Sequence, residues 1–323
     1  MGSSAYGHVP VMAARVTEIL TPAINVPGAV LVDATLGRGG HARALLDACP
    51  QASLIGIDAD PAAIDSAAAL SEDFPGRVRL ARTFYDDIAA VVADAGYTAI
   101  QGVLFDLGVS SPQLDDPERG FAYSRDAPLD MRMDSDGPRT AADIVNSYPV
   151  AELARVLRVY GEERFANRIA EAVARERARE PLATTSRLAG IVRDAIPAPA
   201  RRTGGNPAKR TFQALRIEVN DELGRLGRAL PAALDLLAPS GRFVALAYHS
   251  LEDRLVKRAL AARTADPAPR RLPVRGATAE FRLLTRGAER PDSAEIDANP
   301  RAASARLRAV ERTGHSHDQP GGR

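Results

Sequence analysis

Three short apolar segments in the first third of the chain each end in an aspartate. Asp33 closes residues 29–33, Asp58 closes 53–58 and Asp106 closes 102–106. Open parallel sheets bind ligands at the carboxyl ends of their strands, so these carboxylates are expected to meet at one edge. A glycine-rich turn with the sequence Gly-Arg-Gly-Gly-His follows the first acid at residues 37–41. Its glycines allow a close approach of backbone to ligand, and the helix that follows favours polar or anionic groups.

Two adenosine-containing ligands fit this arrangement. The acid that ends the second strand, Asp58, stands where a carboxylate can accept both hydroxyls of a ribose. The spacing Gly37-x-Gly39-x-x-Ala42 matches the dinucleotide pattern and supports a nicotinamide cofactor. Several carboxylates around one pocket favour a cation instead, because each contributes about 4 kcal/mol at ~4 Å and an effective dielectric near 20. S-adenosylmethionine carries a sulfonium and an ammonium, whereas the dinucleotide carries two phosphates, so the acids favour the methyl donor.

The loop after the fourth strand contains a second set of polar residues. It runs Asp106-Leu-Gly-Val-Ser110-Ser111-Pro112-Gln113. Its acid and hydroxyls are acceptors on a rigid turn, and they could hold an exocyclic amine whose lone pair is delocalised into a ring. Hydrogen bonds from the amine protons would localise that lone pair for attack on a methyl group. An ordinary turn is the alternative interpretation.

A histidine follows the later strand predicted at 242–248. His249 is a candidate for orienting a base or assisting proton removal, and Ser250 beside it is a second candidate. A purely structural donor at a strand end is the alternative for His249.

Strand and helix patterns alternate up to residue 106, which predicts a parallel sheet with helices on both faces. The interval from 106 to 242 is several times longer than the ~30 residues of a βαβ unit, so a helical insertion is expected. Apolar residues at helical spacing occupy 153–160, 165–173 and 188–195. A longer apolar stripe at helical spacing over 212–230 is expected to return the chain to the sheet.

The composition is that of a globular protein with two domains. The chain has 323 residues, 42 basic and 41 acidic side chains, and 45% hydrophobic residues. The near-zero net charge excludes a histone-like polyanion binder. A single cysteine, Cys49, excludes a disulfide framework within the chain and favours a reducing cytoplasm. We expect no membrane span, no signal peptide and no metal site.

Basic residues concentrate in two windows of this nearly neutral chain. The window 201–216 contains Arg201, Arg202, Lys209, Arg210 and Arg216 and no acid. The window 254–290 is also strongly basic. Such windows can form a groove that follows phosphates, although solvated arginine-rich helix faces would give the same pattern.

Four blocks of the sequence resemble one known family. The blocks cover residues 102–121, 126–134, 210–220 and 249–254, and the resemblance extends from His8 to Arg312. The chain resembles the RsmH/MraW family, whose members use S-adenosylmethionine to methylate N4 of a cytidine in 16S ribosomal RNA.

The resemblance implies a class I, Rossmann-like methyltransferase fold with an inserted helical domain. It implies a methyltransferase domain at 1–113 plus 211–312, an inserted substrate-recognition domain at 114–210 and a disordered tail at 313–323. The implied partner is 16S ribosomal RNA, within the small ribosomal subunit, in the cytoplasm and without a membrane. A homodimer is a further expectation from the family.

Site residues follow from the motif positions. The resemblance implies cofactor contacts at Gly39, Gly40, His41, Asp58, Phe84, Asp106 and Gln113. From strand-end geometry, the expected catalytic set is Asp106, Ser110, Ser111, Pro112, His249 and Ser250. The expected contacts to RNA are Arg201, Arg202, Lys209 and Arg210. Two rival functions remain at this point: a nicotinamide-dependent oxidoreductase, and a non-catalytic RNA-binding or ribosome-assembly factor.

Overall fold

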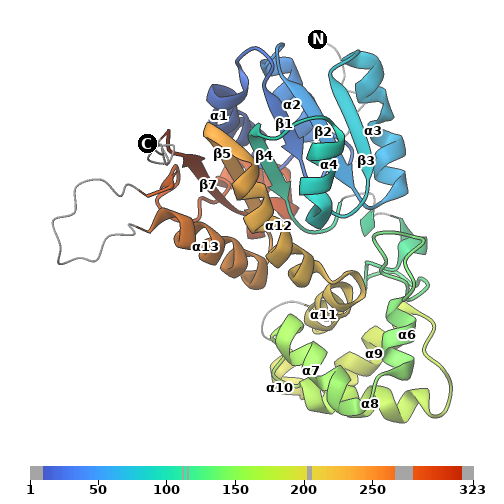
Figure 1. Cartoon of the computed structure of the whole chain (residues 1–323). Helices are drawn as coiled ribbons and strands as arrows, with labels where there is room; N and C mark the ends of the chain where they lie inside the picture. The colour runs from blue at the N-terminus through green and yellow to red at the C-terminus, as the bar shows by residue number, and fades with distance from the viewer. Residues whose placement is uncertain (1–9, 111–112, 115, 202–205, 266–278, 315–323) are drawn as a thin grey trace, which may run out of the picture. The chain divides into compact units, whose positions relative to one another are not determined.

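The chain forms two compact units in the computed structural model (Figure 1). The structure describes residues 10–110, 113–114, 116–201, 206–265 and 279–314. Unit 1 comprises Met1–Gly108 and Arg225–Arg323, and unit 2 comprises Val109–Gly224. Unit 2 spans more residues than the insertion predicted at 114–210. It includes all of helix α11 (Lys209–Asn220), because this helix packs against helix α7 (Val150–Gly161) of the same unit.

A seven-stranded sheet forms the centre of unit 1 in the part of the chain that the structure describes. Its order is β3-β2-β1-β4-β5-β7-β6. The strands are β1 Val30–Asp33, β2 Ser53–Asp58, β3 Val78–Arg82, β4 Ile100–Asp106, β5 Leu237–Ala247, β6 Phe281–Leu283 and β7 Arg306–Arg312. The first five are mutually parallel, and β7 runs antiparallel to both β5 and β6. The order reverses between β1 and β4, which is where open sheets of this kind bind ligands.

Helices cover both faces of this sheet, as predicted (Figure 1). Successive residues of a strand point to opposite faces. Leu31 and Leu104 accordingly pack with helices α1, α2 and α3, whereas Val32 and Phe105 pack with α4, α12 and α13. The helices are α1 Ala13–Ile24, α2 Gly40–Ala48, α3 Pro61–Asp73, α4 Ile88–Asp94, α12 Glu222–Leu236 and α13 Ser250–Thr264, with the shorter η1 Tyr85–Asp87, α14 Ser293–Ala298 and η3 Pro300–Ser304. Because both faces are buried at the centre of the sheet, strands β1, β2 and β4 are mostly apolar.

Unit 2 is helical and has a core of its own. Its elements are η2 Pro117–Arg119, α6 Ala141–Ser147, α7, α8 Ala166–Arg177, α9 Thr185–Ala195, α10 Ala198–Arg201 and α11. Apolar residues from four of these helices, Leu153, Ile169, Leu188 and Phe212, are buried in one cluster. The helical spacings at 153–160, 165–173 and 188–195 thus mark core packing.

The apolar stripe over 212–230 is divided between two helices, α11 and α12. The backbone of Asp221 adopts a left-handed conformation with φ of 49°, which ends α11 and allows α12 to start at Glu222. The apolar stripe continues across the break because both helices bury one face, so periodicity alone does not reveal it.

Two expectations concern the ends and the membrane. No helix in the described ranges is both long enough and apolar enough to cross a membrane. Most of the predicted tail, residues 315–323, lies outside the described residues. Thr313, which the prediction also assigned to the tail, donates its backbone N–H to the carbonyl of Glu280 at 2.9 Å.

The contact between α7 and α11 depends on a glycine. A Cβ atom on Gly161 would lie 2.6 Å from the carbonyl oxygen of Arg210, which is backbone and cannot rotate away. We expect Gly161→Ala to destabilise unit 2 by about 1–3 kcal/mol through overpacking. Hydrogen exchange of the α7 and α11 amides would measure the loss.

The matched control is Gly190→Ala in α9, where the nearest atom to an added Cβ is 4.0 Å away. It should stabilise its helix by up to about 1 kcal/mol. Equal protection of α7 in the two variants would contradict the packing argument.

Candidate active site

The three predicted carboxylates lie at the carboxyl ends of β1, β2 and β4 in unit 1. Backbone hydrogen bonds hold this edge together: the N–H of Ala34 donates to the carbonyl of Leu104 at 2.9 Å. The edge therefore gathers Asp33, Asp58 and Asp106 at the point where the strand order reverses.

The glycine-rich turn fixes the orientation of Asp58. The backbone N–H of Gly37 donates to Oδ2 of Asp58 at 2.8 Å, and the N–H of Asp60 donates to Oδ1 at 2.9 Å. Gly37 has a φ of +52°, in the left-handed region that favours glycine. Asp58 is thereby oriented at the end of β2, where a carboxylate can accept the hydroxyls of a ribose.

The other two glycines allow close packing at the start of α2. Gly39 precedes the helix with a φ of +74°, and an added Cβ would lie 2.4 Å from Cδ1 of Leu70. A Cβ on Gly40 would lie 2.6 Å from Cγ of Pro10. Both glycines are needed for packing as well as for any ligand contact.

Burial makes this edge unfavourable for negative charge. Asp33 is 1% exposed, and burial raises its pKa to about 7. Burial likewise raises the pKa of Asp58 to about 6. A ligand that brings positive charge would lower both pKa values and gain binding energy by doing so.

His41 is a basic side chain at the same edge. Its Nε2 lies 3.5 Å from Oδ2 of Asp106 and has no hydrogen-bond partner in the described structure. Burial by itself would lower the pKa of His41, but the carboxylates of Asp106 and Asp33 outweigh it and raise that pKa above its ordinary value. The buried nitrogen is thus one atom that a bound ligand could satisfy.

Asp106 is held from two further sides. The hydroxyl of Tyr248 donates to Oδ1 of Asp106 at 2.6 Å, and the backbone N–H of Asp106 donates to Oγ1 of Thr35 at 2.6 Å. Burial and the Asp106 carboxylate raise the pKa of Tyr248 well above its ordinary value, so it remains a donor. The Tyr248 ring lies against Gly108, where a Cβ would be 3.2 Å from Cδ2. Sequence reasoning did not single out Tyr248, although it precedes a candidate.

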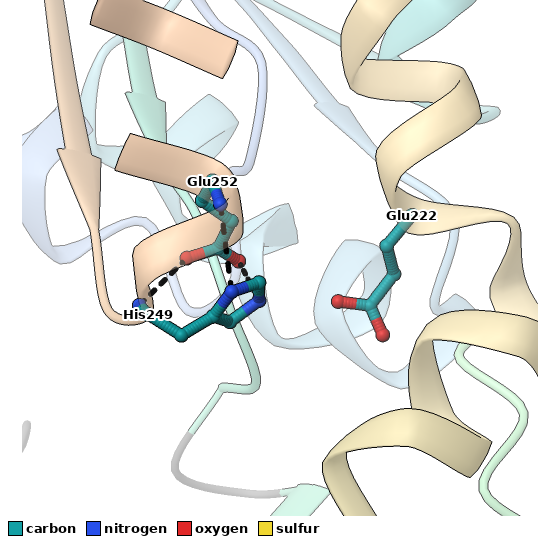
Figure 2. A group of neighbouring side chains, drawn as sticks. All are labelled: Glu222, His249 and Glu252. Carbon is teal, nitrogen blue, oxygen red and sulfur yellow. Dashed lines mark hydrogen bonds and ion pairs between the residues drawn. The ribbon is translucent and has the colours of Figure 1, made fainter. Parts of the chain in front are cut away.

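His249 is the N-terminal cap of α13 (Figure 2). Its Nδ1 accepts from the N–H of Glu252 at 3.4 Å, and its Nε2 lies 3.1 Å from Oε1 of the same residue. The other carboxylate oxygen of Glu252 accepts from the N–H groups of Tyr248 and His249. Both ring nitrogens therefore face Glu252, which favours the structural alternative for His249. Ser250 is the first residue of the helix.

Four predicted residues of the second loop belong to unit 2. The backbone N–H of Ser110 donates to Oε1 of Gln113 at 3.1 Å, and Gln113 is buried. Ser111 and Pro112 lie outside the described residues. The predicted roles of these four residues remain predictions.

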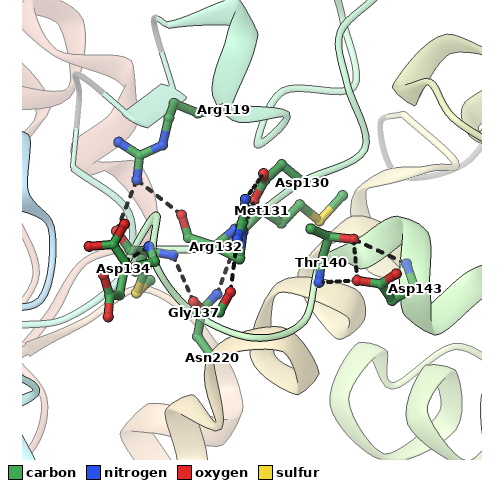
Figure 3. Close-up of polar contacts among 11 residues, drawn as sticks. Arg119, Asp130, Met131, Arg132, Asp134, Gly137, Thr140, Asp143 and Asn220 are labelled. Carbon is green, nitrogen blue, oxygen red and sulfur yellow. Dashed lines mark hydrogen bonds and ion pairs between the residues drawn. The ribbon is translucent and has the colours of Figure 1, made fainter.

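Polar residues of the motif block 126–134, also in unit 2, hold a loop in place (Figure 3). Asp130 binds Arg132 through both carboxylate oxygens. Buried Asn220 donates to the carbonyl of Met131 at 2.8 Å and accepts from the N–H of Met133 at 2.7 Å. Two of the blocks that carried the family resemblance, 126–134 and 210–220, therefore fix a loop to α11.

The two basic windows differ in how their charges are used. Lys209 and Arg210 are exposed at the start of α11, and Arg210 donates to the carbonyl of Glu162 at 3.3 Å. Arg216 instead pairs with Glu222 at 2.8 Å. The backbone of Arg201 ends α10, whereas its side chain and the whole of Arg202 lie outside the described residues.

The second window is partly neutralised by acids of unit 1. Arg263 pairs with Asp235 and Glu280, and Arg282 pairs with Glu311. Ordinary surface pairing thus explains these two residues, and 266–278 lies outside the described ranges.

The fold and the acid edge define a class I, Rossmann-like methyltransferase, as predicted. Comparison with known proteins agrees. The model of the MraW methylase family matches residues 5–313, and the chain belongs to this family.

Named relatives are similar over nearly their full length. A protein of Acidothermus cellulolyticus, "Ribosomal RNA small subunit methyltransferase H", is 61% identical over 94% of this chain and 93% of its own. A protein of Thermobifida fusca with the same name is 60% identical over 97% of this chain and 95% of its own. Among solved structures, an rRNA methylase from Streptococcus thermophilus is 10% identical with a TM-score of 0.43, over 95% of this chain and 99% of that one. That likeness is too low to argue from.

Membership of a methylase family supports the predicted methyl donor, S-adenosylmethionine. The residues present fit it: carboxylates with raised pKa values suit its two positive charges, and Asp58 is positioned by backbone donors as a diol acceptor would be. A pyrophosphate would meet these same carboxylates unfavourably, which disfavours the nicotinamide alternative.

The first prediction from this site concerns the pH dependence of the free energy of unfolding. Between pH 4 and 7 the folded chain keeps the proton of Asp33, with its pKa of about 7, while an unfolded chain releases it. The free energy of unfolding should therefore fall as pH rises through this window. Asp33→Asn should reduce that slope to the part that Asp58, with its pKa of about 6, still contributes. From pH 5 to pH 8 the variant should therefore gain about 2–3 kcal/mol of stability relative to the parent. Urea unfolding at the two pH values measures it.

The exposed Asp47, on α2, provides the control. Asp47→Asn should follow the parent at both pH values. Parallel pH profiles for Asp33→Asn and the parent would show that burial does not hold a proton on Asp33.

The second prediction separates capping from proton transfer at His249. Asparagine is a good helix cap, so His249→Asn should keep both the stability and most of the turnover. His249→Ala should lose about 1 kcal/mol of stability with the cap. Thermal unfolding and methyl-transfer rates would be measured for both. Turnover lost equally in the two variants, with stability kept in the asparagine variant, would make His249 a proton-transfer residue.

Proposed function

We propose that this chain transfers a methyl group from S-adenosylmethionine to N4 of a cytidine in 16S ribosomal RNA. The observation that carries the proposal is the group of three carboxylates at the ends of β1, β2 and β4, which favours a cationic ligand. Asp33 is buried, and Asp58 and Asp106 are partly buried. The names of the relatives, small-subunit ribosomal RNA methyltransferases, support the substrate.

The strand-end residues would divide the cofactor between them. Asp58 would accept the ribose hydroxyls, while Asp33 and Asp106 would face positive charge. The turn Gly39-Gly40-His41 would bring backbone close to the ligand, with Phe84 and Gln113 as further contacts. When bound, S-adenosylmethionine supplies an electrophilic methyl group on a sulfonium.

The amine of the base would be held by acceptors. Asp106 is the first of these, because Tyr248 fixes one of its oxygens and thereby orients the other. Ser110, Ser111 and Pro112 would supply the rest of the amine site. His249, through its capping of α13, and Ser250 would position the turn beside the base. N4 is hidden in a duplex, so the cytidine must be unpaired or extruded. Catalysis is then mostly positioning of the amine for in-line attack.

The helical unit 2 would hold the RNA. Lys209 and Arg210 are exposed and would contact phosphates, and Arg201 and Arg202 lie in the same stretch of sequence. The substrate would be 16S ribosomal RNA within the small subunit, and the chain would act in the cytoplasm, with a homodimer as a further expectation.

The deciding experiment is methyl transfer from labelled S-adenosylmethionine to small ribosomal subunits that lack the modification. Nucleoside mass spectrometry of the product should show N4-methylated cytidine. Label on another nucleoside would overturn the substrate assignment. Cofactor and RNA binding without any transfer would favour the assembly-factor alternative.

The third prediction tests the ribose contact through its pH dependence. The carboxylate form of Asp58 accepts two hydroxyls, and its pKa is about 6, so affinity for adenosine should rise as the pH increases from 5 to 7.5. We expect a rise of up to ~10-fold in the parent and none in Asp58→Asn. Calorimetric titration with adenosine measures both. A pH-independent affinity in the parent would refute this placement of the ribose.

A further inference from the structure

We propose that Arg225 is a positioning residue that holds the ring of Phe84 for the adenosine part of the cofactor. This inference rests on the cofactor placement under the proposed function. Arg225 would set cofactor affinity through Phe84 without touching the ligand itself.

Phe84 stands at the same sheet edge as the expected ribose acceptor. It follows β3, and in the pairing of β2 with β3 Arg82 is opposite Asp58. The N–H of Thr83 also donates to the carbonyl of Asp58 at 3.0 Å. Two residues beyond that pair, a ring at Phe84 is well placed to meet a base attached to the ribose.

The guanidinium of Arg225 covers the Phe84 ring. Its Cζ lies 3.5 Å from the ring centroid, a close cation–π contact. The Phe84 ring is only partly buried, so this contact restricts a side chain that would otherwise have room to rotate. Because Arg225 covers one face of the Phe84 ring, a flat base would stack on the opposite face.

Asp86 holds the guanidinium in that position. Its Oδ1 accepts from Nη1 of Arg225 at 2.8 Å, and its Oδ2 accepts from Arg228 at 2.9 Å. Burial would raise the pKa of Asp86, but the two guanidinium groups outweigh it and keep that pKa below its ordinary value. The anchor is therefore a carboxylate at neutral pH, fixed from both sides.

Arg228 supplies a matched control within the same cluster. It binds the same carboxylate through the other oxygen, and its side chain is 56% exposed. Neutralising Arg228 removes one positive charge and one ion pair, as neutralising Arg225 does, but leaves the cation over the ring.

The charge of Arg225 separates positioning from simple electrostatics. A cation near the site repels a cationic ligand, so its removal would by electrostatics alone tighten binding of S-adenosylmethionine relative to neutral-sulfur S-adenosylhomocysteine. Positioning of Phe84 acts on the adenosine that both ligands and free adenosine share. It predicts equal weakening of all three.

The experiment is calorimetric titration of the full chain with these three ligands. We expect Arg225→Gln to weaken each of them about 3- to 20-fold, from the range of cation–π contacts, and Arg228→Gln to change each by less than about 2-fold. Arg225→Lys should restore binding only in part, because an ammonium lacks the planar face. Thermal unfolding of each variant verifies that it is folded. Asp86→Asn, which weakens the anchor of the Arg225 guanidinium, should also weaken binding of all three ligands.

A double-mutant cycle with Phe84→Leu gives the sharpest test. In the Phe84→Leu background, Arg225→Gln should have almost no further effect, because the residue through which it acts is gone. Additive losses, unchanged binding in Arg225→Gln, or tighter S-adenosylmethionine binding alone would overturn the positioning role. Failure of the parent chain to bind any of the three ligands would instead refute the cofactor placement itself, and the inference with it.

Discussion

The structure of unit 1 depends on the convergence of three parallel strands that each end in a carboxylate. The pairing of β1 with β2 and β4 brings Asp33, Asp58 and Asp106 to one edge, and the helices on both faces bury Asp33 and partly bury the other two acids. The raised pKa values of Asp33, about 7, and Asp58, about 6, show that burial makes negative charge unfavourable at this edge. Folding stability is lost here, and a cationic ligand recovers it on binding.

The neighbouring contacts make sense as responses to that constraint. Backbone donors from Gly37 and Asp60 orient Asp58, and His41 places an imidazole beside Asp106. These contacts orient the acids without fully neutralising them. A positively charged side chain paired with each acid would remove the attraction of these acids for a cationic ligand. The glycine turn therefore orients Asp58, in addition to its proposed contact with the ligand.

The sequence predicts the strands and their acids well, because buried parallel strands are short apolar runs whose ends are chemically marked. It does not show where one residue ends an element: the left-handed backbone at Asp221 divides the apolar stripe over 212–230 between two helices. It also cannot find pairs that only the fold brings together. Nothing in the local pattern around Phe84 points to Arg225, and nothing in spacing links Tyr248 to Asp106. The motif block 126–134 is typical of the family, yet its polar residues described here fasten a loop.

The turn between β5 and α13 shows how this chain combines support with chemistry. Tyr248 and His249 are neighbours in sequence, but one orients the Asp106 carboxylate and the other caps the helix against Glu252. Glu252 in turn accepts the backbone N–H of Tyr248, so the start of the helix fixes the residue that fixes the acid. A strand-end histidine in such a turn controls geometry through the backbone. The proposed reaction, in which an amine is held in line with a methyl group, would need correct placement more than a strong base.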